Sequence, residues 1–196
     1  MQSSTDQIVD EILVVDAQCG SREAFETLVS RWQRRLWAHA YNLTRRPEAA
    51  WDITQDSWLD IVRGLSRLKD PAKFGSWAYR IVSHKASDSL HRNGREIWLD
   101  EELKAVPKDS PASASDQEQR ETADDVHGVL CRLSGHSQVV LNLHYLEGFG
   151  VAEIAEILGT PEGTVKSRLH TARSEFRTHW ESLVDRPSAP IPATAK

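Results

Sequence analysis

The chain has 196 residues, with 24 Lys and Arg against 29 Asp and Glu, which gives a formal net charge of −5. This balance excludes a protein that is basic over its whole surface, so a nucleic-acid-binding surface must be local. No apolar run reaches the roughly 20 residues of a membrane span, and the polar start is not a secretory signal. We therefore expect a cytoplasmic protein with no membrane insertion.

The cysteines and histidines argue against a metal centre or an enzyme. Cys19 and Cys131 are far apart, which excludes a disulfide scaffold and a cysteine-based zinc site. The histidines have no partners at metal-ligand spacing, and the sequence contains no HExxH, Gly-rich phosphate loop or GxSxG motif. We expect no cofactor, no metal and no catalytic residue.

Four helices are predicted in the first half by apolar residues spaced three and four apart. The first, near 6–18, carries the apolar stripe Ile8, Ile12 and Val15. The others begin after Ser21, at Pro47 and after Asp70, since Ser and Asp cap helices and Pro suits a first turn. Their ranges are about 22–43, 47–64 and 71–92. No segment alternates with period two, so an all-α fold is expected.

A change in composition divides the chain. Residues 93–125 hold 4 basic and 10 acidic side chains, two prolines and few large apolar residues. This composition favours an acidic flexible linker over a loop within one domain, because structureless loops of that length are uncommon in compact domains. We predict two small helical domains, 1–92 and 126–184, joined by the linker 93–125 and followed by a disordered tail, 185–196.

The second domain contains a predicted helix-turn-helix, the last two of four helices expected near 126–133, 138–146, 151–158 and 164–183. Ala155, Gly159 and Val165 have the spacing of such a unit: a small residue for a close crossing, a glycine for a left-handed turn and an apolar residue for packing. Residues 164–179 carry four basic side chains and one acidic one. This charge favours a DNA-recognition helix over a helical hairpin with a solvated basic face.

For two surfaces of the first domain, the sequence allows two interpretations each. Asp52, Gln55, Asp56 and Asp60 form a polar, acidic face that is either solvated or a docking surface for a basic partner. On the next helix, Trp77 and Tyr79 lie among basic residues, and single-stranded nucleic acid binds to such mixtures of rings and cations. The alternative is that Phe74, Trp77, Ala78, Ile81 and Val82 form a buried stripe and that the polar edge is merely solvated.

Five segments together resemble the sigma-70 family of bacterial RNA polymerase sigma factors, in its extracytoplasmic-function (ECF) group. They are Ser21–Phe25, Asp52–Asp56, Phe74–Ile81, Tyr145–Gly148 and Gly163–Leu169. The resemblance covers about residues 8–183. It implies a factor that binds core RNA polymerase, directs it to promoters by recognising the −35 and −10 elements, and aids strand opening.

The resemblance also implies a role for each surface. Asp52, Gln55 and Asp56 would dock on the clamp helices of the polymerase β′ subunit, and the second domain on the β flap. Single-stranded DNA of the −10 element would contact Leu68, Lys73, Trp77, Arg80, His84 and Lys85. The −35 element would be read by Thr164, Lys166, Ser167, Arg168, His170, Thr171 and Arg173. The short tail leaves no room for a further regulatory domain, so regulation would come from an anti-sigma factor or from expression level.

Two positions depart from the family pattern. His84 stands where many relatives have Asn, and Thr171 where relatives often have Arg, which affects the expected base specificity. The main alternative function is a helix-turn-helix regulator that binds duplex DNA unaided. That alternative explains 127–183 but gives no role to the basic, aromatic helix near residue 77 or to the acidic linker.

Overall fold

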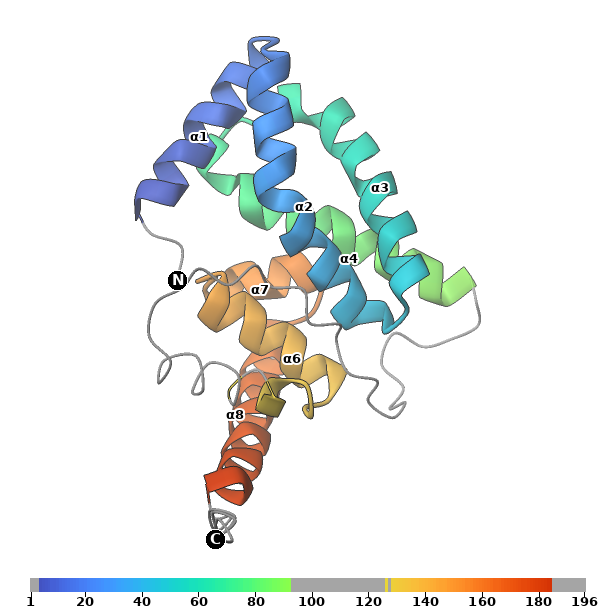
Figure 1. Ribbon diagram of the computed structural model, residues 1–196, viewed down its shortest axis with the longest axis vertical. Coiled ribbons are helices and arrows are strands. Elements are labelled where there is room, and N and C mark those ends of the chain that lie inside the picture. The colour runs from blue at the N-terminus through green and yellow to red at the C-terminus, as the bar shows by residue number, and fades with distance from the viewer. Residues whose placement is uncertain (1–3, 93–125, 127, 185–196) are drawn as a thin grey trace, which may run out of the picture.

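The computed structural model describes residues 4–92, 126 and 128–184. Every regular element in these ranges is helical (Figure 1). In chain order they are α1 (Ser4–Gln18), α2 (Arg22–Thr44), α3 (Pro47–Gly64), η1 (Leu65–Arg67), η2 (Pro71–Lys73), α4 (Phe74–Arg92), α6 (Gly135–Leu141), η3 (Asn142–Leu146), α7 (Val151–Leu158) and α8 (Glu162–Val184). The all-α prediction is confirmed. The predicted linker 93–125 and tail 185–196 lie outside the described residues, and the domain boundaries stay predictions.

Local capping chemistry sets the helix starts that the sequence predicted. The Ser21 hydroxyl accepts a hydrogen bond from the Ala24 N–H at 3.2 Å and caps α2. Asp70 accepts one from the Ala72 N–H at 3.1 Å, directly before Pro71. Each cap satisfies a backbone donor that a helix start leaves without an intrahelical partner. Asp70 starts the short η2 turn rather than α4 itself, so α4 begins after this turn and not directly after its predicted cap.

The helices α1 to α4 surround an aromatic and aliphatic core. Leu28, Trp32 and Leu36 of α2 are buried against Ile61 of α3 and Phe74 of α4. Trp32 is central, because its ring makes edge contacts with Phe74 at 5.3 Å and with Tyr79 at 6.0 Å between ring centroids. Burial of large aromatic rings supplies much of the free energy that holds such a bundle together.

The first helix packs through a different face from its apolar stripe. Ile8, Ile12 and Val15 are 57%, 55% and 44% exposed, whereas Val14 and Asp10 point inward. On the inward side, Leu13, Val14 and Ala17 pack in or against the core. Arg31 of α2 lies with its Nε 2.7 Å from an Asp10 carboxylate oxygen and supplies the partner that an inward-facing carboxylate needs.

The fourth helix buries most of its predicted stripe. Phe74, Ala78 and Val82 are buried, and Trp77 and Ile81 are half-buried. Tyr79, one of the two rings considered for nucleic-acid contact, is 2% exposed. It cannot stack on a base, because it lies on the side of α4 that faces Trp32 and the second half of the chain.

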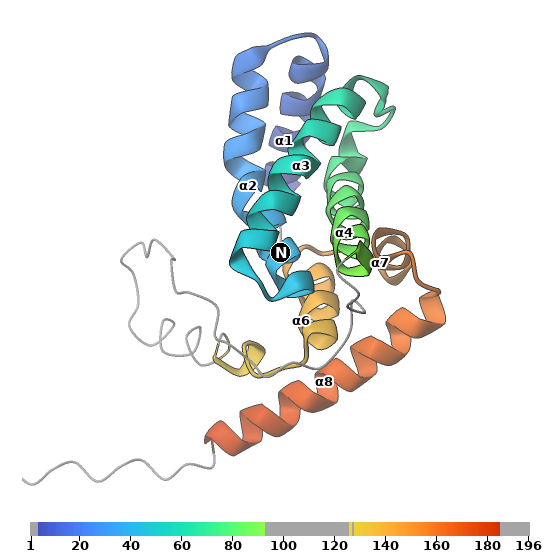
Figure 2. The ribbon, with the colours of Figure 1, turned by 90° about the vertical axis from the view of Figure 1, so that its right-hand side faces the viewer.

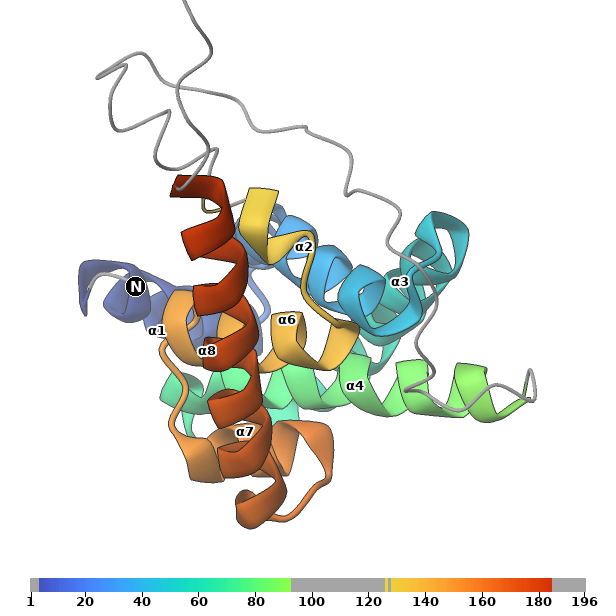
Figure 3. The same cartoon turned by 90° about the horizontal axis from the view of Figure 1, so that it is seen from below.

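The second half forms a helical unit that lies directly below the first. Its α6 starts after Ser134, which accepts a hydrogen bond from the Ser137 N–H at 3.3 Å, and runs into the π-helical turn η3. The unit touches the first half through α6 against α2 and through α7 against α4, while α8 extends away from α1 and α3 (Figures 1 and 2). Seen from below, α7 lies alongside α4 and α8 crosses α6 (Figure 3). Buried residues of both halves belong to one continuous core.

A buried histidine makes the stability of the fold depend on pH. His39 of α2 is 5% exposed and its Nε2 lies 2.8 Å from the Ser83 hydroxyl oxygen. Burial lowers the pKa of His39 from 6.5 to about 3. The folded protein therefore keeps His39 neutral, while the unfolded chain takes up a proton below pH 6.5, so stability is lost as pH falls from about 6.5 towards 3.

We expect the free energy of unfolding to fall by about 2 kcal/mol between pH 7.5 and pH 5 through this residue, at 1.36 kcal/mol per pH unit below 6.5. In His39→Gln, which keeps a polar side chain but does not titrate, most of this dependence should disappear. Urea unfolding at both pH values measures the effect. If the free energy of unfolding changed equally between the two pH values in His39→Gln and in the wild type, the pH dependence would belong to other groups.

Candidate nucleic-acid and partner interfaces

The outer face of α3 combines acidic and apolar side chains. Asp52, Gln55 and Asp56 are all exposed on it. The same helix carries three exposed apolar residues that the sequence did not assign to this surface: Trp51, Leu59 and Val62, which are 46%, 55% and 55% exposed. A helix face with apolar anchors among charges has the composition of a protein-binding surface. The helical spacing of these α3 residues can be read from the sequence, but which of them are exposed cannot.

A groove of about 1060 Å³ runs beside this face, between the start of α3 and the end of α4. Glu48, Asp52, Asp56 and Asp88 supply four carboxylates to its walls, and Arg46 and Lys85 supply two cations. The surplus of negative charge extends the acidic character of the α3 face. It favours a basic partner over nucleic acid at this position.

The described part of α4 presents one basic and aromatic face. Trp77, Arg80 and His84 follow one another at spacings of three and four, which brings them to one side of α4, and Lys73 at the end of η2 precedes Trp77 by four residues. Arg80 and His84 are exposed and Trp77 is half-buried. Cations on either side of a ring can hold a phosphate backbone while a base stacks.

Two neighbouring residues fix this face in position. Gly64, at the end of α3, lies so close to the Trp77 ring that a Cβ there would come within 2.8 Å of it. Gln18, at the end of α1, donates hydrogen bonds from Nε2 to the carbonyl oxygens of Leu65 and Leu68, both at 2.8 Å. The half-buried Leu68 and the turn before α4 are thereby tied to α1. No local pattern indicates this role of Gln18, because its partners are 47 and 50 residues away.

Lys85 lies apart from the other predicted DNA contacts. Its ammonium group is 2.7 Å from an Asp60 carboxylate oxygen of α3, and the side chain is 26% exposed. One residue after His84, the side chain is rotated by about 100° around the helix axis and points towards α3. The structure therefore brings together Lys73, Trp77, Arg80 and His84 but not Lys85, whose assignment to DNA stays a prediction.

The turn between α7 and α8 has the backbone that the helix-turn-helix prediction requires. Gly159 adopts φ +62° and ψ +35°, the left-handed conformation that glycine reaches without steric cost. Ile154 of α7 and Val165, Leu169 and Ala172 of α8 are buried. This packing fixes the crossing of the two helices and leaves the opposite side of α8 to solvent.

The predicted recognition residues divide into two groups on α8. Lys166, Ser167, His170, Thr171 and Arg173 are exposed. Thr164 and Arg168 are half-buried at the edge of the packed face, and burial lowers the pKa of the Arg168 guanidinium. Arg173 donates from Nε to the Tyr145 hydroxyl at 2.8 Å, which ties α8 to η3. The exposed group is the one able to reach a DNA groove without rearrangement.

The described residues lack two other kinds of feature. No group of three or more His, Cys, Asp or Glu side chains there is arranged to hold a metal ion. Among the helices of this part of the chain, none is long and apolar enough to cross a membrane.

Comparison with known proteins places this arrangement in a family. Residues 28–96 match the model for Sigma-70 region 2, and residues 123–176 match the model for Sigma-70, region 4. The chain is 33% identical to the ECF RNA polymerase sigma factor SigM of Mycobacterium tuberculosis, over 85% of this chain and 82% of that protein. It is 29% identical to the ECF RNA polymerase sigma-E factor of Haemophilus influenzae, over 91% of this chain and 99% of that protein.

Solved structures of similar proteins agree with these sequence matches. The protein CnrH, solved in complex with the cytosolic domain of CnrY, matches with a TM-score of 0.55 at 25% identity and covers 92% of this chain and 99% of its own. The sigma factor RpoE of Bartonella quintana, solved with the anti-sigma factor NepR, shares the fold with a TM-score of 0.59 at 22% identity, over 83% of this chain and 98% of its own. The chain thus belongs to the sigma-70 family of RNA polymerase sigma factors, in its ECF group, and directs promoter-specific transcription initiation.

Proposed function

We propose that three separate helix faces carry out the steps of initiation, without catalysis by this chain. The acidic and apolar face of α3 docks on the clamp helices of the polymerase, and the second half of the chain contacts the β flap. The face of Lys73, Trp77, Arg80 and His84 holds the opened −10 strand. The exposed side of α8 reads the −35 element in duplex DNA. The protein acts in the cytoplasm.

The observation that carries this proposal is the separation of charge between the faces. Asp52, Gln55 and Asp56 are exposed on α3, whereas Lys166, His170 and Arg173 are exposed on α8. A DNA backbone repels the first surface and attracts the second. A regulator that binds duplex DNA unaided would need only the second, so the α3 and α4 surfaces favour a factor that works within a polymerase.

An anti-sigma factor is a further proposed partner. One structural relative was solved with an anti-sigma factor and another with the cytosolic domain of a partner protein. A partner that covers the α3 face would compete with the polymerase for the same apolar residues. Co-purification of the chain with core polymerase, with and without a candidate anti-sigma protein, tests both interactions together.

Reversing one charge tests the docking face. We expect Asp56→Arg to weaken binding to core polymerase by about tenfold or more, equivalent to about 1.4 kcal/mol, because like charges across an interface repel. Asp16→Arg is the matched control, since Asp16 is also exposed but lies on α1, outside both proposed polymerase-binding surfaces. Fluorescence titration of labelled chain with core enzyme gives both affinities. Equal affinities for the two variants would remove Asp56 from the docking face.

Removing one cation tests the recognition helix. We expect Lys166→Ala to weaken the binding of holoenzyme to a −35-containing promoter by roughly 1–3 kcal/mol if Lys166 contacts a base. A phosphate contact would instead give a uniform loss over promoter sequences and a salt slope smaller by about one. Arg22→Ala, at an exposed position on α2, is the control. Unchanged affinity and salt slope would show that Lys166 does not touch DNA.

A further inference from the structure

Tyr145 is an exposed aromatic residue that none of the proposed interfaces uses. It is 50% exposed near the end of η3, and so it contributes little to the core. Its hydroxyl accepts the hydrogen bond from Arg173 Nε at 2.8 Å, across 28 residues of chain. The guanidinium carbon lies 5.7 Å from the centre of the ring, near the outer limit of a cation–π contact. The hydroxyl, rather than the face of the ring, is therefore the main contact of Tyr145 with Arg173.

The segment around η3 restrains the Tyr145 ring. η3 is a π-helical turn, in which the Glu147 N–H donates to the Asn142 carbonyl oxygen at 3.0 Å, and turns of this kind are frequent at functional sites. The His144 ring packs edge to face against the Tyr145 ring, with 4.8 Å between ring centroids. His144 is held in turn, because its Nδ1 lies 3.0 Å from the Phe149 carbonyl oxygen. Tyr145 is thus restrained by its own segment where it meets α8.

Arg173 keeps most of its hydrogen-bonding capacity. A guanidinium has five N–H donors, and Tyr145 accepts only from the one on Nε. Within the part of the chain that the structure describes, Arg173 forms no ion pair, and no acidic residue lies three or four positions from it on α8. The exposed side chain can therefore bind an anion through both terminal nitrogens, which is a geometry in which arginine binds phosphate.

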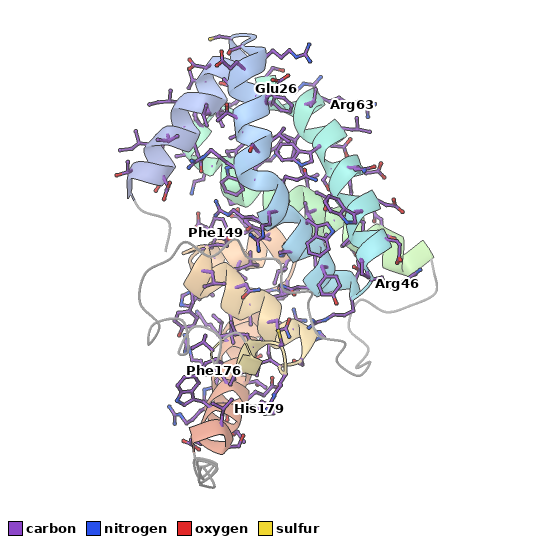
Figure 4. All side chains as sticks on the ribbon, in the orientation of Figure 1. Glu26, Arg46, Arg63, Phe149, Phe176 and His179 are labelled. Atoms are coloured by element: carbon purple, nitrogen blue, oxygen red, sulfur yellow. The ribbon has the colours of Figure 1, made fainter. Side chains whose placement is uncertain are left out.

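The position of Arg173 along α8 favours a backbone phosphate over a base. Arg173 lies eleven residues after Glu162, where α8 begins, or about 16 Å along the helix axis at 1.5 Å per residue. Phe176, three residues later, lies on the part of α8 that extends away from α1 to α4 (Figure 4). The first residues of a recognition helix contact bases, and the major groove is about 12 Å wide. With the start of α8 in the groove, Arg173 lies at the level of the DNA backbone.

We propose that Tyr145 is a positioning residue for DNA binding, whose hydroxyl holds the Arg173 guanidinium ready to bind a backbone phosphate beside the −35 element. The proposal rests on the assignment of the −35 element to α8. A long arginine side chain loses rotamer freedom when it binds, and Tyr145 removes part of this freedom before DNA arrives. Because a hydroxyl is uncharged, it orients the guanidinium without cancelling the charge that attracts the phosphate, as a carboxylate would.

Removal of the hydroxyl alone tests the proposal in the holoenzyme. Tyr145→Phe keeps the ring and should weaken binding to a promoter fragment about fivefold, with the same ratio on a fragment whose −35 element is mutated, because a phosphate carries no sequence information. Arg173→Ala should weaken binding about tenfold and lower the salt slope by about one, whereas Tyr145→Phe keeps the charge and hence the slope.

The double variant separates positioning from a purely structural role. Tyr145→Phe added to Arg173→Ala should cause no further loss, because the hydroxyl then has no guanidinium to orient. A structural role would instead make the two losses multiply to about fiftyfold and would lower the midpoint of thermal unfolding. Thr178→Val is the matched control, since it also removes an exposed hydroxyl from the second half, on α8 beyond Arg173, and should change neither affinity nor salt slope.

The results that overturn the proposal differ from those that overturn the −35 assignment. The positioning role of Tyr145 is refuted if Tyr145→Phe binds like Thr178→Val, or if its loss persists in full when Arg173 is already alanine. Weaker binding by Lys166→Ala together with unchanged binding by Arg173→Ala would keep α8 as the reader of the −35 element and refute the role of the Tyr145–Arg173 pair. Unchanged binding by both variants would refute the −35 assignment itself.

Discussion

The burial of the Arg35–Glu147 ion pair is the constraint on which the joint between the two halves depends. Arg35 lies against the ring of Trp32, which is also the centre of the core of the first half. A guanidinium in that position requires a carboxylate, and the one that reaches it comes from the other half of the chain. The core of one half and the charge of the other are thereby coupled, so disturbance of this pair affects packing as well as electrostatics.

The surfaces proposed to bind polymerase and DNA lie on helix faces that this packing leaves at least partly exposed. The polar residues of α3 and most of the basic residues of α8 are exposed, while Lys73 at the start of the α4 face takes part in the joint itself. Lys73 pairs with Glu153 across the joint and is also one of the residues proposed to contact DNA. Glu147 and Glu153 bind cations of the first half, whereas Asp52 and Asp56 are exposed on α3.

Features set by neighbouring residues were predicted well. The caps at Ser21 and Asp70 and the left-handed turn at Gly159 depend on contacts within a few residues, and the structure contains all three. Predictions that depended on which face of a helix is buried were less successful. The apolar stripe of α1 is exposed because Leu13, Val14 and Ala17 are the residues that pack in or against the core, and Tyr79 is buried between the rings of Trp32 and Phe149.

The sequence by itself determined the all-α fold, the helix-turn-helix and the family, since periodicity, caps and motif residues act over short stretches of chain. It also located the residues of the three proposed binding faces, because helical spacing decides which side chains share a face. Only the tertiary structure decided that Lys85 pairs with Asp60, that Arg168 is half-buried and that Gln18 anchors Leu68. It alone revealed the joint, because Arg35 and Glu147 are 112 residues apart and neither has a local pattern that identifies its partner.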